Sequence, residues 1–290
     1  MKNTERVSRM ARAFLAASFM LIGIQTAAHA DLERIREKAV ELEQKLNKHH
    51  YEVSARGEDS NTLRIYKDFA FLLKESKVDE AREAEGFEAA RLKHFLIESA
   101  VNFELASYLD DLNKFERTGT ADFNGVPTTY HGLINQLANA EVDKDRRAIY
   151  TALKGMVETA NIYRNQIVTR RNELFQAWGY DNYAQFYAEK NGIDLAEVSK
   201  AAEDLLTETQ AQYDALFEAV VMDQMGVEAR KVKLLDIPFL LSGAKYLDAF
   251  PVADQQTRSK AVLSGLGLSS QGLVFDEKER EGRAAGWGVY

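Results

Sequence analysis

Hydrophobic residues recur every three or four positions along most of this chain, which is the spacing of amphipathic helices. Between Ile149 and Trp178 the apolar positions are separated by 4, 3, 4, 3, 4, 7 and 4 residues, close to a heptad pattern. Such a spacing favours a long helix that packs along another long helix. The pattern therefore predicts a helix over residues 143–178, begun by Asp143 and ended by Gly179.

The same periodicity predicts helix for most of the remaining chain. Asn-Gly and Pro signals predict a loop over 121–130, and weak alternation after residue 266 is compatible with the start of a strand. Two of the predicted helices, over 80–117 and 143–178, are long enough to lie antiparallel. The expected fold is therefore all-α, an elongated multi-helix bundle. Its other predicted helices cover residues 32–53, 62–77, 129–140, 181–190, 195–225 and 255–265.

The first 30 residues have the three parts of a secretory signal peptide. Four basic residues precede the apolar run 13–24, and Ala28-His29-Ala30 provides a small-x-small cleavage site. A membrane anchor is the alternative, but this run is shorter than the roughly 20 residues that span a bilayer. We expect a signal peptide over 1–30, a helical region over 31–290, and a periplasmic or secreted location.

Composition limits the classes of partner and of metal site. The chain has 37 Lys and Arg residues and 45 Asp and Glu residues. Removing the four basic residues and the one acidic residue of the signal peptide leaves 33 basic and 44 acidic residues, a net charge near −11. This charge argues against nucleic acid and against anionic membrane surfaces, both of which attract clustered Lys and Arg. Because the chain has no Cys, disulfides are excluded and any metal site would use His, Asp or Glu.

Few residues suggest chemistry. His94 and Glu98 are four apart on one predicted helix and could share a metal or a proton, but a zinc site needs three or four converging ligands. A structural polar pair is the favoured interpretation. His49 and His50 end an acidic helix, and His131 is expected to be a polar residue at a helix start.

Two further groups admit either a structural or a binding role. Arg170, Arg171 and Glu173 are expected to form ion pairs or to contact a substrate carboxylate, with the structural role the more common. Aromatic side chains at a helix–turn–helix corner are expected to form core or to line a peptide cleft. No catalytic or metal-binding residue is assigned, and the substrate-binding residues stay unknown. The aromatic residues are Trp178, Tyr180, Tyr183, Phe186 and Tyr187.

Residues 171–186, RNELFQAWGYDNYAQF, resemble a stretch of the zinc peptidases of the thimet oligopeptidase and oligoendopeptidase F group. In that group an Arg-Asn-Glu helix runs into a Leu-Gly-Tyr corner, and Trp178 replaces the Leu here. Further family-like segments follow in the family's order, although Leu235 stands where a Trp is usual. The resemblance covers roughly residues 80–286, and these later segments lie at 234–238, 246–251, 266–268 and 276–286.

The resemblance implies a mainly helical, two-lobed enzyme that cuts short peptides. In that family a His-Glu-x-x-His helix supplies two zinc ligands and the Glu that activates water. No such motif occurs in these 290 residues, so no zinc ligand is carried over and no cofactor is expected in this chain itself. We therefore expect the N-terminal part of an exported zinc oligopeptidase, truncated before the zinc helix and inactive by itself, with short peptides as partners.

Two alternatives remain open at this point. One is a stand-alone exported helical module that binds peptides or acts like a chaperone. The other is an unrelated exported helical bundle with a metal site at His94 and Glu98. The sequence leaves open whether the chain is an enzyme.

Overall fold

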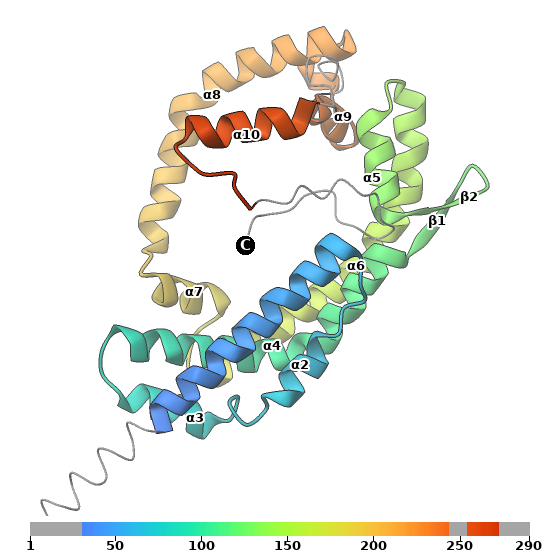
Figure 1. Cartoon of the computed structure of the whole chain (residues 1–290). Helices are drawn as coiled ribbons and strands as arrows, with labels where there is room; N and C mark the ends of the chain where they lie inside the picture. The colour runs from blue at the N-terminus through green and yellow to red at the C-terminus, as the bar shows by residue number, and fades with distance from the viewer. Residues whose placement is uncertain (1–30, 244–253, 273–290) are drawn as a thin grey trace, which may run out of the picture. The chain divides into compact units, whose positions relative to one another are not determined.

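The computed structural model describes residues 31–243 and 254–272, and most of them are helical (Figure 1). The predicted all-α, multi-helix fold is confirmed. The predicted signal peptide and the family-like segments 246–251 and 276–286 lie outside the described residues. The first described helix spans 31–56. It is followed by α2 (Thr62–Asp68), α3 (Glu75–Glu83), α4 (Phe87–Thr118), β1 (Thr120–Phe123), β2 (Val126–Thr129), α5 (Tyr130–Asn139), α6 (Asp143–Ala177), α7 (Tyr183–Asn191), α8 (Leu195–Met225), α9 (Ile237–Ser242) and α10 (Gln255–Gly265), with 3₁₀ turns η1 (Ala229–Lys231) and η2 (Leu234–Asp236) before α9.

The chain forms two compact units. The first contains the described residues up to His50, together with Asn61–Ser107 and Arg170–Lys190. The second contains Tyr51–Ser60, Tyr108–Thr169 and the described residues from Asn191 onward. The long helices α4 and α6 each contribute residues to both units.

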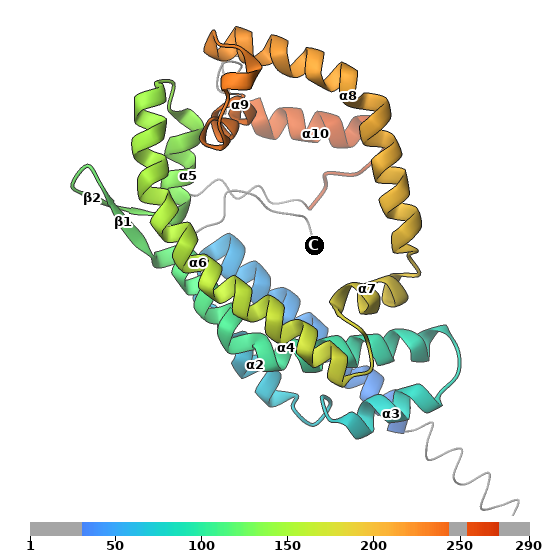
Figure 2. The same cartoon turned by 180° about the vertical axis from the view of Figure 1, so that it is seen from behind.

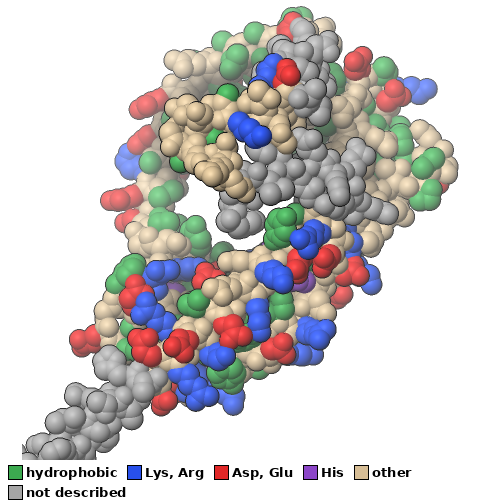
Figure 3. All heavy atoms as spheres, in the orientation of Figure 1, with side chains coloured by type: hydrophobic (Ala, Val, Ile, Leu, Met, Phe, Trp, Pro, Cys, Tyr) green, Lys and Arg blue, Asp and Glu red, His purple; other side chains and the backbone are tan. Residues whose placement is uncertain are grey.

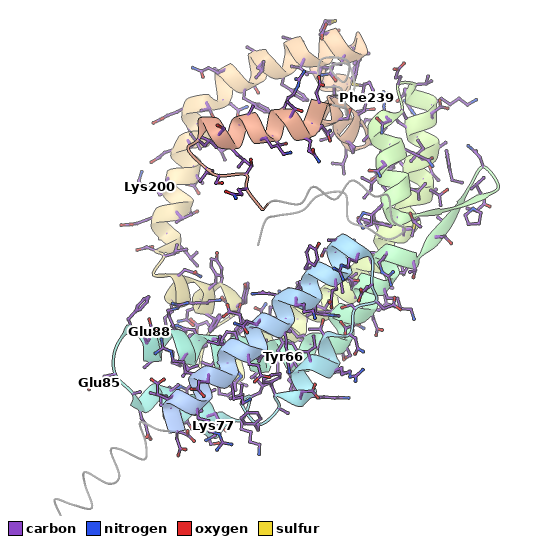
Figure 4. All side chains as sticks on the ribbon, viewed as in Figure 1. Tyr66, Lys77, Glu85, Glu88, Lys200 and Phe239 are labelled. Atoms are coloured by element: carbon purple, nitrogen blue, oxygen red, sulfur yellow. The ribbon has the colours of Figure 1, made fainter. Side chains whose placement is uncertain are left out.

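The core of the first unit is aliphatic and aromatic. Tyr66 on α2, labelled in Figure 4, lies with its ring centroid 6.2 Å from that of Phe103 on α4. At the surface of this unit, Arg36 Nη2 donates to Glu88 Oε2 over 3.1 Å. The fully buried side chains of the unit come from the first described helix, the turns after α2, and α3, α4, α6 and α7, and they include Leu42, Leu72, Val78, Leu96, Ile97, Val101, Phe175 and Phe186.

The second unit is built around α5 and α6, both labelled in the view of Figure 2. Leu133 and Leu137 on α5 pack with Ile149, Leu153 and Met156 on α6. These α6 positions are part of the near-heptad series, so the seam predicted from the sequence is buried here, against a short helix. On α6, a hydrogen bond of 2.5 Å also joins Arg164 Nη2 to Glu116 of α4.

Several helix ends lie where the sequence predicts them. Asp194 accepts hydrogen bonds from the backbone amides of Ala196 and Glu197 and so caps α8. Gly226 ends α8 in the left-handed conformation, at φ 65°, which glycine adopts without a Cβ penalty. Gly179, at φ 91°, follows α6 in the same way.

Four predicted elements need correction. The predicted helix 80–117 is two helices, because Gly86 at φ 100° separates α3 from α4. The predicted helix 62–77 is also two, since α2 ends at Asp68 and turns precede α3. Residues 266–272 are turns and coil rather than the start of a strand.

The predicted loop 121–130 is instead an antiparallel hairpin. Strands β1 and β2 pair Thr120 with Thr129 and Phe123 with Val126. Asn124 and Gly125 between them both have positive φ, which a two-residue hairpin turn requires. Asn-Gly therefore marks a hairpin turn, and the four-residue strands on either side of it are too short for their alternation to be recognised.

Candidate functional site

The corner between α6 and α7 is an aromatic core. Phe175 on α6 has its ring centroid 4.5 Å from that of Phe186 on α7, and Tyr180 meets Phe186 edge to face at 5.1 Å. All three rings are buried. Tyr187 points outward, and Trp178 is partly buried. The structural interpretation of these aromatics therefore holds for the centre of the cluster, while two rings stay accessible at its edge.

Asn172 fixes the geometry of this corner. Its side-chain oxygen accepts from the backbone amide of Tyr183 over 3.1 Å, which ties the end of α6 to the start of α7. Gln185 and Asn182 add side-chain hydrogen bonds to backbone amides at the same turn. These polar residues belong to the family-like stretch 171–186, so the stretch encodes a defined turn.

A polar cluster lies beside the corner, centred on Glu189 of α7. Its Oε1 accepts from Lys93 Nζ over 2.7 Å and lies 2.9 Å from His94 Nε2. The Tyr180 hydroxyl lies 3.4 Å from the same oxygen. His94 is buried and edge-on to Phe186, so its second neighbour is apolar.

The cluster shifts two pKa values. Hydrogen bonds from Lys93 and His94 lower the pKa of Glu189, against the opposing effect of partial burial. Burial, together with the charge of Glu189, raises the pKa of Tyr180 to about 12. The carboxylate is thus held ionised beside a neutral phenol, which is a stable hydrogen-bonding arrangement over the physiological pH range.

The predicted pairing of His94 with Glu98 is not what the structure forms. Glu98 instead receives a hydrogen bond of 2.5 Å from Lys190 Nζ, and His94 turns to Glu189. The predicted structural role for these two side chains therefore agrees with their polar contacts, but they do not pair with each other. The alternative of a metal site at His94 and Glu98 also has no third ligand, because the described part of the chain holds no group of three His, Asp or Glu placed to bind a metal.

The other candidate residues have local structural contacts. His49 Nε2 accepts from the backbone amide of Asn61 over 3.0 Å. His131 is exposed in the first turn of α5, as expected. Arg170 forms an exposed ion pair of 3.0 Å with Glu173, and Arg171 lies 5.3 Å above the ring of Tyr183.

A buried ion pair in the second unit was not anticipated. Arg146 Nε donates to Asp236 Oδ1 over 2.7 Å, and each side chain is only 3% exposed. Arg146 Nη1 also donates to the carbonyls of Ala140 and Glu141, and its guanidinium lies 5.0 Å from the centre of the Phe239 ring. The sequence signal was Asp236 immediately before the Ile-Pro start of α9, within a family-like segment, but nothing in the sequence identified Arg146 as its partner.

The helix α8 leaves an apolar face uncovered. Its one buried residue is Val221, near its C-terminal end. Seven large apolar side chains of α8 are between 43% and 65% exposed. Met222 lies on the opposite side of the helix, and the six that share one face are Leu195, Val198, Leu205, Leu206, Tyr213 and Leu216. The sequence predicted the helix and its apolar spacing correctly, but not that this face is left uncovered by the other elements within residues 31–243 and 254–272.

Comparison with protein-family models, with curated proteins and with solved structures gives no match to this chain. What the structure itself defines is an all-α, multi-helix protein. None of the helices in residues 31–243 and 254–272 is long and apolar enough to cross a membrane.

Proposed function

We propose that this chain is the non-catalytic helical part of an exported zinc oligopeptidase, one that contacts short peptides but does not supply the groups that cleave them. The support for this proposal is the corner at residues 171–186. Its family-like residues make a tight connection between two helices, held by Asn172 and filled by Phe175 and Phe186. Trp178 and Tyr187 remain accessible beside it, and such rings are common contacts for peptides.

The proposal can be tested with purified chain 31–290. Trp287→Phe leaves Trp178 as the single tryptophan, so its fluorescence reports on the corner. We expect short peptides to change this fluorescence saturably, with no cleavage detectable by mass spectrometry and no stoichiometric zinc in equilibrium dialysis. Zinc-dependent cleavage would contradict the absence of catalytic groups, and an unchanged fluorescence at every peptide concentration would contradict the contact.

A second candidate function is a stand-alone exported helical module that binds polypeptides. The observation that favours it is that each unit has its own buried core, as an independently folding protein requires. The test is the thermal unfolding and the sedimentation of the same chain. A cooperative transition and a monodisperse profile are expected, whereas a molten, aggregating chain would refute this candidate.

A further inference from the structure

The apolar face of α8 follows one side of the helix along most of its length. With about 100° per residue, its apolar side chains fall within a stripe about 120° wide. From Leu195 to Val220 this stripe is about 38 Å long at 1.5 Å per residue. Near its C-terminal end the rings of Tyr213 and Phe217 stack at 5.7 Å, which gives the stripe a flat aromatic section. A helix with such a face is normally packed against another element.

The rest of α8 is strongly acidic. It carries one basic residue, Lys200, which is labelled in Figure 4 and lies on the side of the helix away from the stripe. In Figure 3, Asp and Glu side chains stand along the edge of the molecule over α8. The seven acidic residues of the helix are Glu197, Glu203, Asp204, Glu208, Asp214, Glu218 and Asp223.

This charge pattern discriminates between possible partners. Glu203 and Asp214 flank one edge of the stripe, and Glu208 lies beyond the other. A second copy of α8 would therefore bring like charges together on both sides of the apolar contact, which is destabilising. An anionic membrane surface would be repelled for the same reason. A helix with an apolar face and flanking Lys or Arg satisfies both the stripe and its acidic edges.

We propose that the α8 face binds a cationic amphipathic helix with apolar residues at i, i+3, i+4 and i+7. This inference deepens the second candidate function by naming the class of partner, and it rests on that proposal. The stripe accommodates a partner helix of about 25 residues. Apolar burial along the stripe supplies most of the affinity, and the acidic edges set the orientation and exclude acidic partners.

The probe is a synthetic helical peptide of about 25 residues, with leucine on the apolar positions and lysine on the flanking ones. Its binding to chain 31–290 is measured by fluorescence anisotropy. Two control peptides separate the contributions: a scrambled peptide of the same composition, and a peptide in which glutamate replaces lysine. We expect saturable binding of the first peptide alone, weakened by added salt because the flanking charges are exposed.

Protein variants locate the contact. Leu206→Gln and Leu216→Gln lie on the stripe, and each is expected to weaken binding about tenfold or more. Met222→Gln is the matched control, because Met222 is also exposed on α8 but lies on the opposite side of the helix. Glu203→Lys is expected to weaken binding while leaving the apolar stripe intact.

Several outcomes would overturn the proposal. They are equal binding of the scrambled peptide, equal weakening by Met222→Gln, self-association in sedimentation that Leu216→Gln abolishes, and binding to phosphatidylcholine vesicles without binding to the peptide. Each variant is also melted. A chain that is folded and monodisperse but does not bind the cationic peptide refutes this inference alone, whereas a molten wild-type chain refutes the second candidate function.

Discussion

Removing the carboxylate of Asp236 is expected to destabilise the second unit strongly. In Asp236→Ala the guanidinium of Arg146, 3% exposed, would lose the carboxylate with which it forms its buried ion pair, while it stays enclosed by Phe239 and the α5 C-terminus. The backbone amide of Lys233 would also lose its acceptor, Asp236 Oδ2, at 2.9 Å. Breaking a buried pair from one side costs about 3–5 kcal/mol, because an uncompensated charge remains buried.

The assay is urea unfolding of chain 31–290 followed by circular dichroism. Because the chain has two compact units, hydrogen exchange at the amides of α5 and α9 assigns the loss to the second unit. Glu173→Ala is the matched control, since its ion pair with Arg170 is about half exposed and such pairs contribute about 0–1 kcal/mol. A third variant, Arg146→Met with Asp236→Leu, removes both charges and is expected to recover most of the stability.

Two results would refute this reasoning. If Asp236→Ala costs no more than Glu173→Ala, the buried charge is not compensated by this carboxylate. If the double variant is as unstable as Asp236→Ala, the loss comes from packing or from the α9 N-terminus rather than from an unpaired Arg146.

Three other perturbations have defined outcomes. Phe186 is fully buried, so Phe186→Ala is expected to lower the free energy of unfolding in urea by about 3–5 kcal/mol. Phe87 is 74% exposed, so Phe87→Ala should change it by no more than about 0.5 kcal/mol. Equal losses in the two variants would contradict the conclusion that the corner between α6 and α7 is a core. An added Cβ meets no atom at Gly226 or at Gly155, so neither substitution to Ala causes a clash. Gly226→Ala is expected to lower the free energy of unfolding by about 1–2 kcal/mol, because Gly226 has a positive φ. Gly155→Ala, within the exposed part of α6, is expected to raise it by about 0.5–1 kcal/mol. The pKa of Tyr180 is raised to about 12, so its phenol ionises at lower pH in the unfolded chain than in the folded one. The stabilisation that Tyr180 contributes is therefore present below pH 10 and is lost as pH rises towards 12. Alkaline titration of tyrosinate absorbance measures this ionisation, and Tyr180→Phe should remove the contribution of Tyr180 to the pH dependence of stability.

The helices could be predicted because their information is local. A 3.6-residue periodicity, a capping Asp194 and a left-handed Gly226 are each written in a few neighbouring residues. The errors also had local causes. Gly86 interrupts an otherwise regular apolar pattern, and the strands β1 and β2 are too short for alternation to be recognised.

The candidate sites depended on partners far apart in the chain. His94 and Glu98 are neighbours on one helix, but their hydrogen-bonding partners, Glu189 and Lys190, come from α7. Arg146 reaches Asp236 across 90 residues of sequence. No periodicity or spacing encodes such distances, since they follow from how α4, α6, α7 and α9 pack.

The sequence by itself determined an all-α chain with an acidic surface, no cysteine chemistry and no His-Glu-x-x-His motif, because composition and short-range periodicity suffice for these conclusions. Tertiary structure alone decided which apolar stripes are covered. The α6 stripe is buried against α5 at Ile149, Leu153 and Met156, while the equally regular stripe of α8 remains exposed. Amphipathic spacing indicates that a helix has an apolar face, but whether that face is covered depends on how the other elements pack.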